Sequence, residues 1–111
     1  MKKIFDKIKE ANISICNYKE KDKLCGYELN TYTDGGVNQI VFVDFRDTDK
    51  KPKSENDFKK LFLERINSID IDEEIEINRE NKLYKQNFTL TQSLKDFEDW
   101  KRNLLKLANS L

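Results

Sequence analysis

The spacing of apolar residues predicts a helix and then a strand at the start of the chain. Ile4, Phe5 and Ile8 fall on one side of residues 2–11, with lysines around the rest, which is the pattern of a short amphipathic helix. From residue 13 to about residue 18 apolar and polar positions alternate, which predicts a strand. A charged turn follows it.

The next segment predicts a β-hairpin over 24–46. Its two strands, 24–33 and 37–45, are rich in β-forming residues and flank the sequence Asp-Gly-Gly at 34–36. Glycine adopts the positive φ angles of tight hairpin turns, so this sequence favours a reversal of the chain. The run 40–43 has no polar break, which predicts a strand covered on both faces and therefore central in its sheet.

The rest of the chain reads mainly as helix. Ser54 and Asp57 have the spacing of a capping box, and the apolar positions after them predict a helix to about residue 68. The acidic segment after residue 70 suits either an edge strand or a short helix over 72–80 capped by Asp72, and we favour the helix. A final helix begins at residue 89 or 91, with one apolar stripe made of Leu94, Phe97, Trp100, Leu104, Leu107 and Leu111.

These elements predict a single α+β domain over 1–111. We expect a small antiparallel sheet of about three strands, built around the hairpin 24–46. An N-terminal helix and two or three C-terminal helices should pack on one face of it. Trp100, on the apolar stripe of the last helix, is expected in the core rather than on a ligand platform.

Composition argues against most catalytic chemistry. The chain has no histidine, which removes the commonest general base and zinc ligand, and no glycine-rich phosphate loop. Cys16 and Cys25 are expected to be small apolar side chains within strands, without a disulfide framework. We therefore predict a non-enzymatic protein with no metal and no cofactor. An alternative is a metal-dependent nuclease that uses Asp44, Asp47 and Asp49.

Charge is balanced overall but unevenly distributed. Lys plus Arg and Asp plus Glu both number 21, so neither bulk DNA binding nor a uniformly acidic surface is expected. Between residues 64 and 80, however, seven acids stand against two arginines. These acids either cap helices and keep the domain soluble, or meet a basic groove on another macromolecule. The candidate partner-binding acids are Asp70, Asp72, Glu73, Glu74 and Glu76.

The hairpin tip is a second candidate for partner binding. Tyr32, Asp34 and Asn38 combine an aromatic ring with hydrogen-bonding groups at a projecting turn, a composition common at interfaces. The alternative is a plain turn with a cross-strand aromatic residue. No signal peptide and no apolar run long enough to cross a bilayer stands out, so a cytoplasmic protein is expected.

Three strings, taken in order, resemble small accessory proteins of phages, plasmids and conjugative elements of low-GC bacteria, which often accompany anti-restriction and anti-CRISPR genes. The likeness spans residues 26–100, and its strings are GYELNTYTDGGVN, DIDEEI and FTLTQSLKDFEDW. The resemblance implies an anti-defence protein that binds a host nuclease complex stoichiometrically. The balanced charge departs from the strongly acidic DNA mimics among such inhibitors.

The sequence thus carries two main functional hypotheses. The first is a mobile-element protein that binds and inhibits a host defence nuclease complex through a protein–protein contact. The second is a small DNA-binding regulator or plasmid-maintenance factor, which would use the lysine-rich N-terminus and residues 50–60.

Overall fold

The structure is a computed structural model that describes residues 2–33, 38–46, 51–80 and 90–111. Its described part contains three strands and four helices, which confirms the predicted α+β class. In chain order the elements are α1 (Lys2–Glu10), β1 (Ser14–Glu20), β2 (Lys23–Tyr32), β3 (Asn38–Asp44), α2 (Glu55–Asn67), α3 (Ile71–Glu80) and α4 (Leu90–Ser110).

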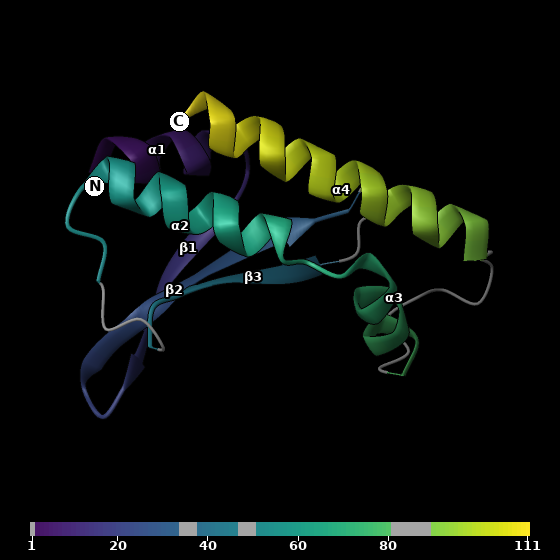
Figure 1. The fold of residues 1–111 in the computed structure, drawn as a ribbon, viewed down its shortest axis with the longest axis horizontal. Helices are drawn as coiled ribbons and strands as arrows, with labels where there is room; N and C mark the ends of the chain where they lie inside the picture. Colours follow the sequence, from purple (N-terminus) through teal and green to yellow (C-terminus); the bar gives the residue numbers. More distant parts are fainter. Residues whose placement is uncertain (1, 34–37, 47–50, 81–89) are drawn as a thin grey trace.

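The three strands form an antiparallel sheet in the order β1-β2-β3, with α1, α2 and α4 together on one side of it (Figure 1). β2 is therefore the central strand, and the prediction that the strand 37–45 is central and covered on both faces was wrong. Along β3 the side chains alternate: Val41 and Val43 are buried, whereas Ile40 and Phe42 are 48% and 47% exposed. An unbroken apolar run at a sheet edge has the same sequence pattern as a buried strand.

The turn between β1 and β2 is shorter than the charged sequence 19–23 that predicted it, because β1 extends to Glu20. Glu20 pairs with Lys23, so Lys21 and Asp22 alone make the turn. Both have positive φ angles, 49° and 64°, as the central residues of a type I′ hairpin turn require. A tight hairpin thus forms without glycine, at some conformational cost.

Gly26 lets β2 and β3 approach each other closely. A Cβ atom placed on Gly26 would lie 2.8 Å from the carbonyl oxygen of Val43 and 3.0 Å from the Cα of Asp44. Both neighbours are backbone atoms, which cannot turn aside as a side chain can. Glycine is therefore a packing requirement at this position.

The helix starts follow from local capping. The Ser54 side chain accepts a hydrogen bond from the Asp57 backbone N–H, which confirms the predicted start of α2, and Asp57 in turn accepts from the Lys53 backbone N–H. The segment after residue 70 is the helix that we favoured. Its cap, however, is Asp70 and not Asp72, because the Asp70 carboxylate accepts from the Glu73 backbone N–H.

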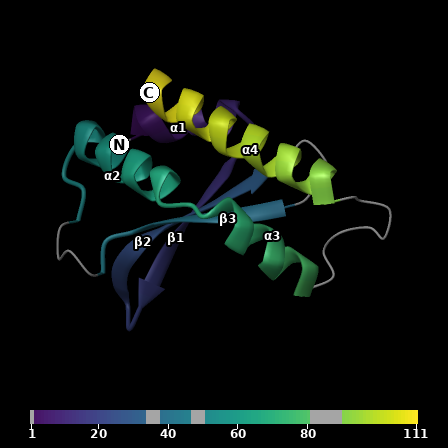
Figure 2. The same ribbon diagram turned by 45° about the vertical axis from the view of Figure 1, so that its right-hand side comes forward.

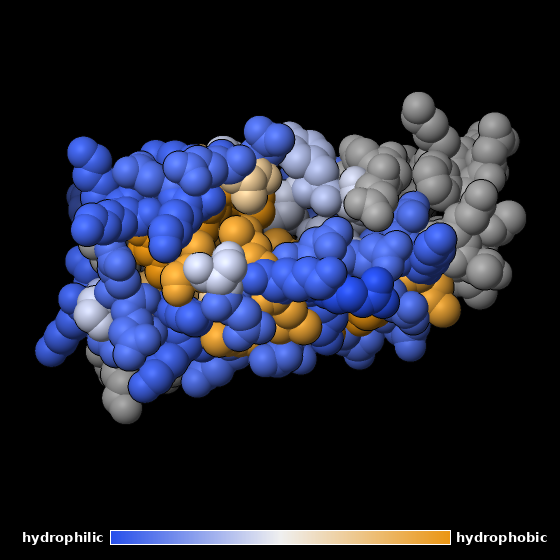
Figure 3. Space-filling view, turned by 90° about the horizontal axis from the view of Figure 1, so that it is seen from above, coloured by the Kyte–Doolittle hydropathy of each residue, from blue (hydrophilic) through white to orange (hydrophobic). Residues whose placement is uncertain are grey.

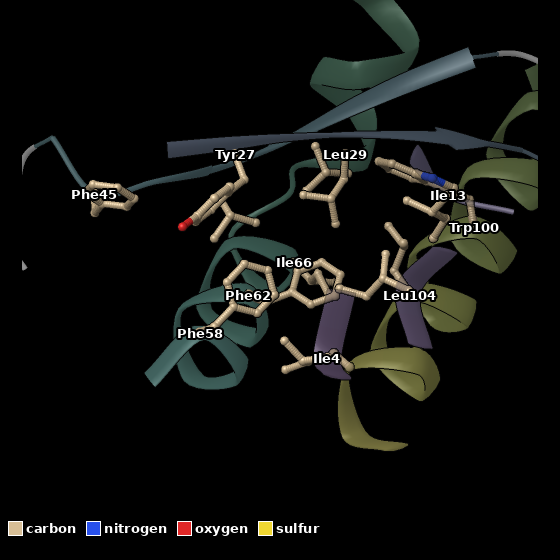
Figure 4. Packing of buried hydrophobic residues seen from close by; sticks show 14 of the residues in the cluster. Ile4, Ile13, Tyr27, Leu29, Phe45, Phe58, Phe62, Ile66, Trp100 and Leu104 are labelled. Atoms are coloured by element: carbon tan, nitrogen blue, oxygen red, sulfur yellow. The ribbon is translucent and has the colours of Figure 1, made fainter. Parts of the chain in front are cut away.

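The hydrophobic core lies between the sheet and the three helices on its covered side (Figure 4). Edge-to-face contacts among Phe5, Tyr27 and Phe58 join α1, β2 and α2 at 5.1–5.7 Å between ring centroids. Trp100 is 4% exposed, so its predicted place in the core is confirmed. Seen from the helical side, the surface is mostly hydrophilic, with a strip of hydrophobic residues between the helices (Figure 3).

A chain of buried polar contacts fixes α3 and α4 on the sheet. The Trp100 indole N–H donates to the Thr31 hydroxyl at 2.9 Å, and this hydroxyl donates to the Gln39 carbonyl at 2.7 Å. The Gln39 and Asn78 side-chain amides then exchange two hydrogen bonds, at 2.8 and 3.3 Å. We call Thr31, Gln39, Asn78 and Trp100 the buried polar chain. It joins α4, β2, β3 and α3 through groups whose burial demands partners.

The two cysteines differ in environment. Cys25 is buried, as predicted, and its thiol donates to the Lys23 carbonyl. Cys16 is exposed, so the prediction of an apolar filler was wrong for this residue: its side chain lies on the side of the sheet away from the helices. Within the described residues, no helix combines the length and apolar character needed to cross a membrane.

The close approach of β2 and β3 at Gly26 predicts that Gly26→Ala destabilises the protein. In open space, Gly→Ala stabilises a protein by about 0.4–1 kcal/mol through the unfolded state. Here Gly26→Ala should instead lower the free energy of unfolding by about 1–3 kcal/mol, because the added methyl group meets backbone. Urea denaturation would measure the change, with the exposed Ser14→Ala as control. A stabilised Gly26→Ala protein would contradict the packing argument.

Candidate binding surface

The side of the sheet opposite the helices has no layer of helices over it in the described structure (Figure 1). Strand pairing aligns the side chains of this side in rows, such as Cys16–Glu28–Phe42 and Ser14–Asn30–Ile40. We call this side the open face, and it consists of Ser14, Cys16, Tyr18, Gly26, Glu28, Asn30, Tyr32, Asn38, Ile40, Phe42 and Asp44.

The open face carries the most exposed large hydrophobic side chains of the described residues. Tyr32, Ile40 and Phe42 are 59%, 48% and 47% exposed, more than the two others of this kind, Ile77 and Leu94. Such side chains gathered on one face are typical of an interface core, and the half-buried Glu28 and Asn30 supply polar groups among them. Tyr18 extends the apolar surface, with its ring in edge contact with Phe42 at 6.1 Å.

Ion pairs organise one end of the open face around Arg46. Its guanidinium lies 5.2 Å from the centre of the Tyr18 ring and pairs with Glu20 and Asp44, both at the same end of the sheet. The Tyr18 hydroxyl also donates to Glu20 at 2.9 Å. These hydrogen bonds, first from Tyr18 and then from Arg46, lower the pKa of Glu20, while the bond to Glu20 raises the pKa of Tyr18.

Asp44 belongs to the same ion-pair group. Partial burial works to raise the pKa of its carboxyl, but hydrogen bonds from the Arg46 side chain and backbone N–H outweigh this and lower it. The nuclease hypothesis uses Asp44 together with Asp47 and Asp49. Of these three residues, Asp47 and Asp49 lie outside the described residues. Within the residues described, no group of three or more histidine, cysteine or acidic side chains is placed to hold a metal ion.

The acidic segment forms helix α3, which stands beside β3 at one end of the molecule (Figure 2). Asp72, Glu73 and Glu76 are exposed, as a solvent-facing partner surface requires. Asp70 has a structural role as the helix cap, in addition to its exposure. Glu74 is half-buried, and burial followed by the neighbouring charges of Glu73 and Asp70 raises the pKa of its carboxyl.

The two predicted partner-binding segments lie at the same end of the fold. Tyr32 and Asn38 are paired across β2 and β3 and are both exposed, while Asp34 lies outside the described residues. The next residue along β3, Gln39, holds α3 through Asn78. The acidic helix and the hairpin end, which the sequence left as alternatives, are therefore neighbours.

Most of the side chains that dominate the open face were not among the predicted site residues. Ile40 and Phe42 were expected in a covered strand, and Tyr18 and Arg46 were not singled out. Their exposure depends on the position of β3 at the sheet edge and on the helices packing on one side alone. Burial alternates along β3, but the sequence shows only an unbroken apolar run over 40–43, which is equally compatible with a strand covered on both faces.

The opposite end of the molecule is more basic. A depression of about 640 Å³ near the β1–β2 turn has Leu24, Cys25 and Phe45 on its apolar part. Its charged lining consists of Lys21, Lys23, Arg46 and Lys51 with a single acid, Glu20. The described structure is thus polarised, with acids on α3 and bases around this depression.

Comparisons with known proteins bring no relative: no protein family, no curated protein and no solved structure matches this chain.

The half-buried carboxyl of Glu74 gives a pH-dependent prediction. A raised pKa means that stability present at low pH is lost as the pH rises through that pKa, because the charged form is disfavoured in the folded state. Glu74→Gln removes this loss, so the stability of the variant relative to the natural chain should increase between pH 4 and pH 7. Urea midpoints at both pH values would measure it. The exposed Glu76→Gln controls for charge removal. A Glu74→Gln difference that does not change with pH would contradict the assignment.

Proposed function

We propose that this chain is a non-enzymatic protein of a mobile genetic element that binds and inhibits a host defence nuclease complex. The observation that carries the proposal is the open face, where Tyr32, Ile40 and Phe42 are exposed together. Aromatic and large aliphatic side chains surrounded by polar groups are the composition of protein–protein interface cores. The resemblance to accessory proteins of phages and plasmids supports the class of partner.

The charges around the open face favour a protein partner over nucleic acid. Glu20, Glu28 and Asp44 stand there against Arg46, whose guanidinium already pairs with two of them. Phosphate groups would be repelled by these acids, and the residues that make up the open face include no lysine or arginine to replace their counterions. Aromatic rings alone, without a basic groove, do not make a single-strand binding surface.

Helix α3 supplies the electrostatic part of the proposed contact. Its exposed acids, Asp72, Glu73 and Glu76, lie at the end of the sheet where Tyr32 and Asn38 are exposed. A nuclease that holds nucleic acid presents basic grooves, so opposed potentials would speed the encounter and set the orientation. Tyr32 and the acids of α3 together would then contact one partner surface.

The proposal predicts that the chain protects incoming DNA in a bacterium with an active restriction or RNA-guided nuclease. Its expression should raise the efficiency with which a targeted plasmid is established. Tyr32→Ala should reduce this protection about tenfold or more, as loss of an aromatic anchor does. Asp72→Lys/Glu76→Lys should do the same by reversing charge on α3. Counts of transformants would measure each effect.

A matched control comes from α1. Asp6 and Glu10 are exposed acids with the same four-residue spacing as Asp72 and Glu76, on a different helix. Asp6→Lys/Glu10→Lys should therefore retain protection, with circular dichroism confirming that all variants fold. Equal loss in both charge reversals, or protection unaffected by Tyr32→Ala, would contradict the proposed surface.

The basic depression favours a DNA-binding regulator as the second candidate. Lys21, Lys23 and Lys51 lie near one another there without an ion pair among the described residues. Their charge is the kind that contacts phosphates. Arg46, the fourth base, is already engaged by acids, which weakens this candidate.

The two candidates separate in a gel-shift experiment with duplex DNA. If the first is right, the chain leaves the duplex unshifted even at low ionic strength. A DNA-binding regulator would instead shift it, with affinity falling steeply as salt increases. Lys21→Glu/Lys23→Glu would then abolish the shift, and that result would replace the inhibitor proposal.

A further inference from the structure

The outer edge of β3 presents backbone groups available for pairing. Phe45 N–H donates to the Cys25 carbonyl, which makes this a hydrogen-bonded pair of the antiparallel ladder. Hydrogen-bonded pairs alternate along the ladder, so the backbone N–H and C=O groups of Val41 and Val43 also point toward β2. The N–H and C=O groups of Ile40 and Phe42 therefore point outward, away from β2. Within the described residues no backbone partner meets them.

The two edges of the sheet differ in how they are protected. β1 carries an irregularity at Tyr18/Lys19 and ends in charged residues, and both features discourage pairing with another strand. β3 pairs with β2 without a register shift, contains no proline, and has its first charged residue at Asp44. Arg65 donates to the outward carbonyl of Asp44, so protection there is limited to the last residue of the strand. Residues 40–43 remain a regular, apolar edge between Asp44 and the start of the strand, where Gln39 is bonded to α3.

This edge is complementary to a second copy of itself. In an antiparallel pair centred on Val41, Ile40 of each copy would lie opposite Phe42 of the other, and Asn38 would lie opposite Asp44. Shifting this register by two residues would place an apolar side chain opposite Asn38 or Asp44 instead. The centred register therefore gives every exposed apolar side chain of β3 an apolar neighbour, which is the favourable cross-strand arrangement.

The charge polarity of the molecule favours the same antiparallel arrangement. The start of β3 lies beside acidic α3, to which Gln39 is bonded through Asn78. The end of β3 leads to Arg46 and the basic depression. An antiparallel pairing brings the start of one strand to the end of the other, so acids of each copy approach bases of the other. A parallel pairing would place like charges together.

We propose that this protein forms a two-fold dimer through β3, with backbone hydrogen bonds between Ile40 and Phe42 of the two copies. The two three-stranded sheets become one continuous sheet. The open faces then join into one surface, on which Tyr32 is present twice. The inference goes beyond the proposed function, because it concerns self-association and not the partner.

Sedimentation velocity of the full chain tests the dimer. The natural chain should show a concentration-dependent monomer–dimer equilibrium. Ile40→Lys/Phe42→Lys should weaken association about tenfold or more, because it removes both apolar pairs and sets like charges opposite each other. Tyr32→Lys, on the same face but in the central strand, should leave the dimer intact.

A charge exchange separates loss of pairing from loss of folding. Ile40→Glu/Phe42→Glu should also be monomeric, but an equimolar mixture with Ile40→Lys/Phe42→Lys should form heterodimers, because opposite charges then face each other across the two-fold axis. A natural chain that stays monomeric up to hundreds of micromolar would overturn the proposal. So would a mixture that fails to associate, or a dimer that Tyr32→Lys disrupts equally.

Discussion

Four polar side chains inside the fold determine where its surfaces lie. A buried donor or acceptor without a partner costs about 1–3 kcal/mol, so Thr31, Gln39, Asn78 and Trp100 are held in one arrangement by the bonds they exchange. This arrangement sets α4 over the end of the sheet and α3 beside β3. The Gln39–Asn78 pair, together with the buried Ile75 of α3, holds the acidic helix next to the exposed end of the hairpin.

Because the three helices pack on one side alone, one face of the sheet is covered and the other is exposed in the described structure. Three helices supply enough apolar side chains to cover one face, with Phe58, Phe62 and Phe97 fully buried there. The opposite face keeps hydrophobic side chains that the chain itself does not cover in the described structure. An antiparallel sheet tolerates such a solvated face, whereas large exposed side chains gathered on it point to an interaction.

Much of the fold could be predicted from local patterns, whereas the candidate binding surface could not. Helix periodicity and the Ser54 cap predicted α2, and first-turn acids predicted α3, because these signals act over a few residues. The place of β3 in the sheet depends on pairing between distant segments, so its apolar run was misinterpreted as central. Likewise, Asp72 was predicted as the N-cap of α3 and Asp70 is the observed one, because aspartate is a favourable N-cap residue at either position. The acidic and hairpin segments were identified separately, and the bonds between Gln39 and Asn78, which bring them together, join residues that are 39 positions apart in the sequence.

The exposed thiol of Cys16 has a practical consequence. It shares a row of the sheet with Glu28 and Phe42, whereas the other cysteine, Cys25, is buried and hydrogen-bonded. A maleimide dye would therefore attach preferentially at one native position, on the same surface as the apolar side chains. The fluorescence of the dye would then change when the open face passes from contact with water to contact with another molecule, and no engineered cysteine is needed.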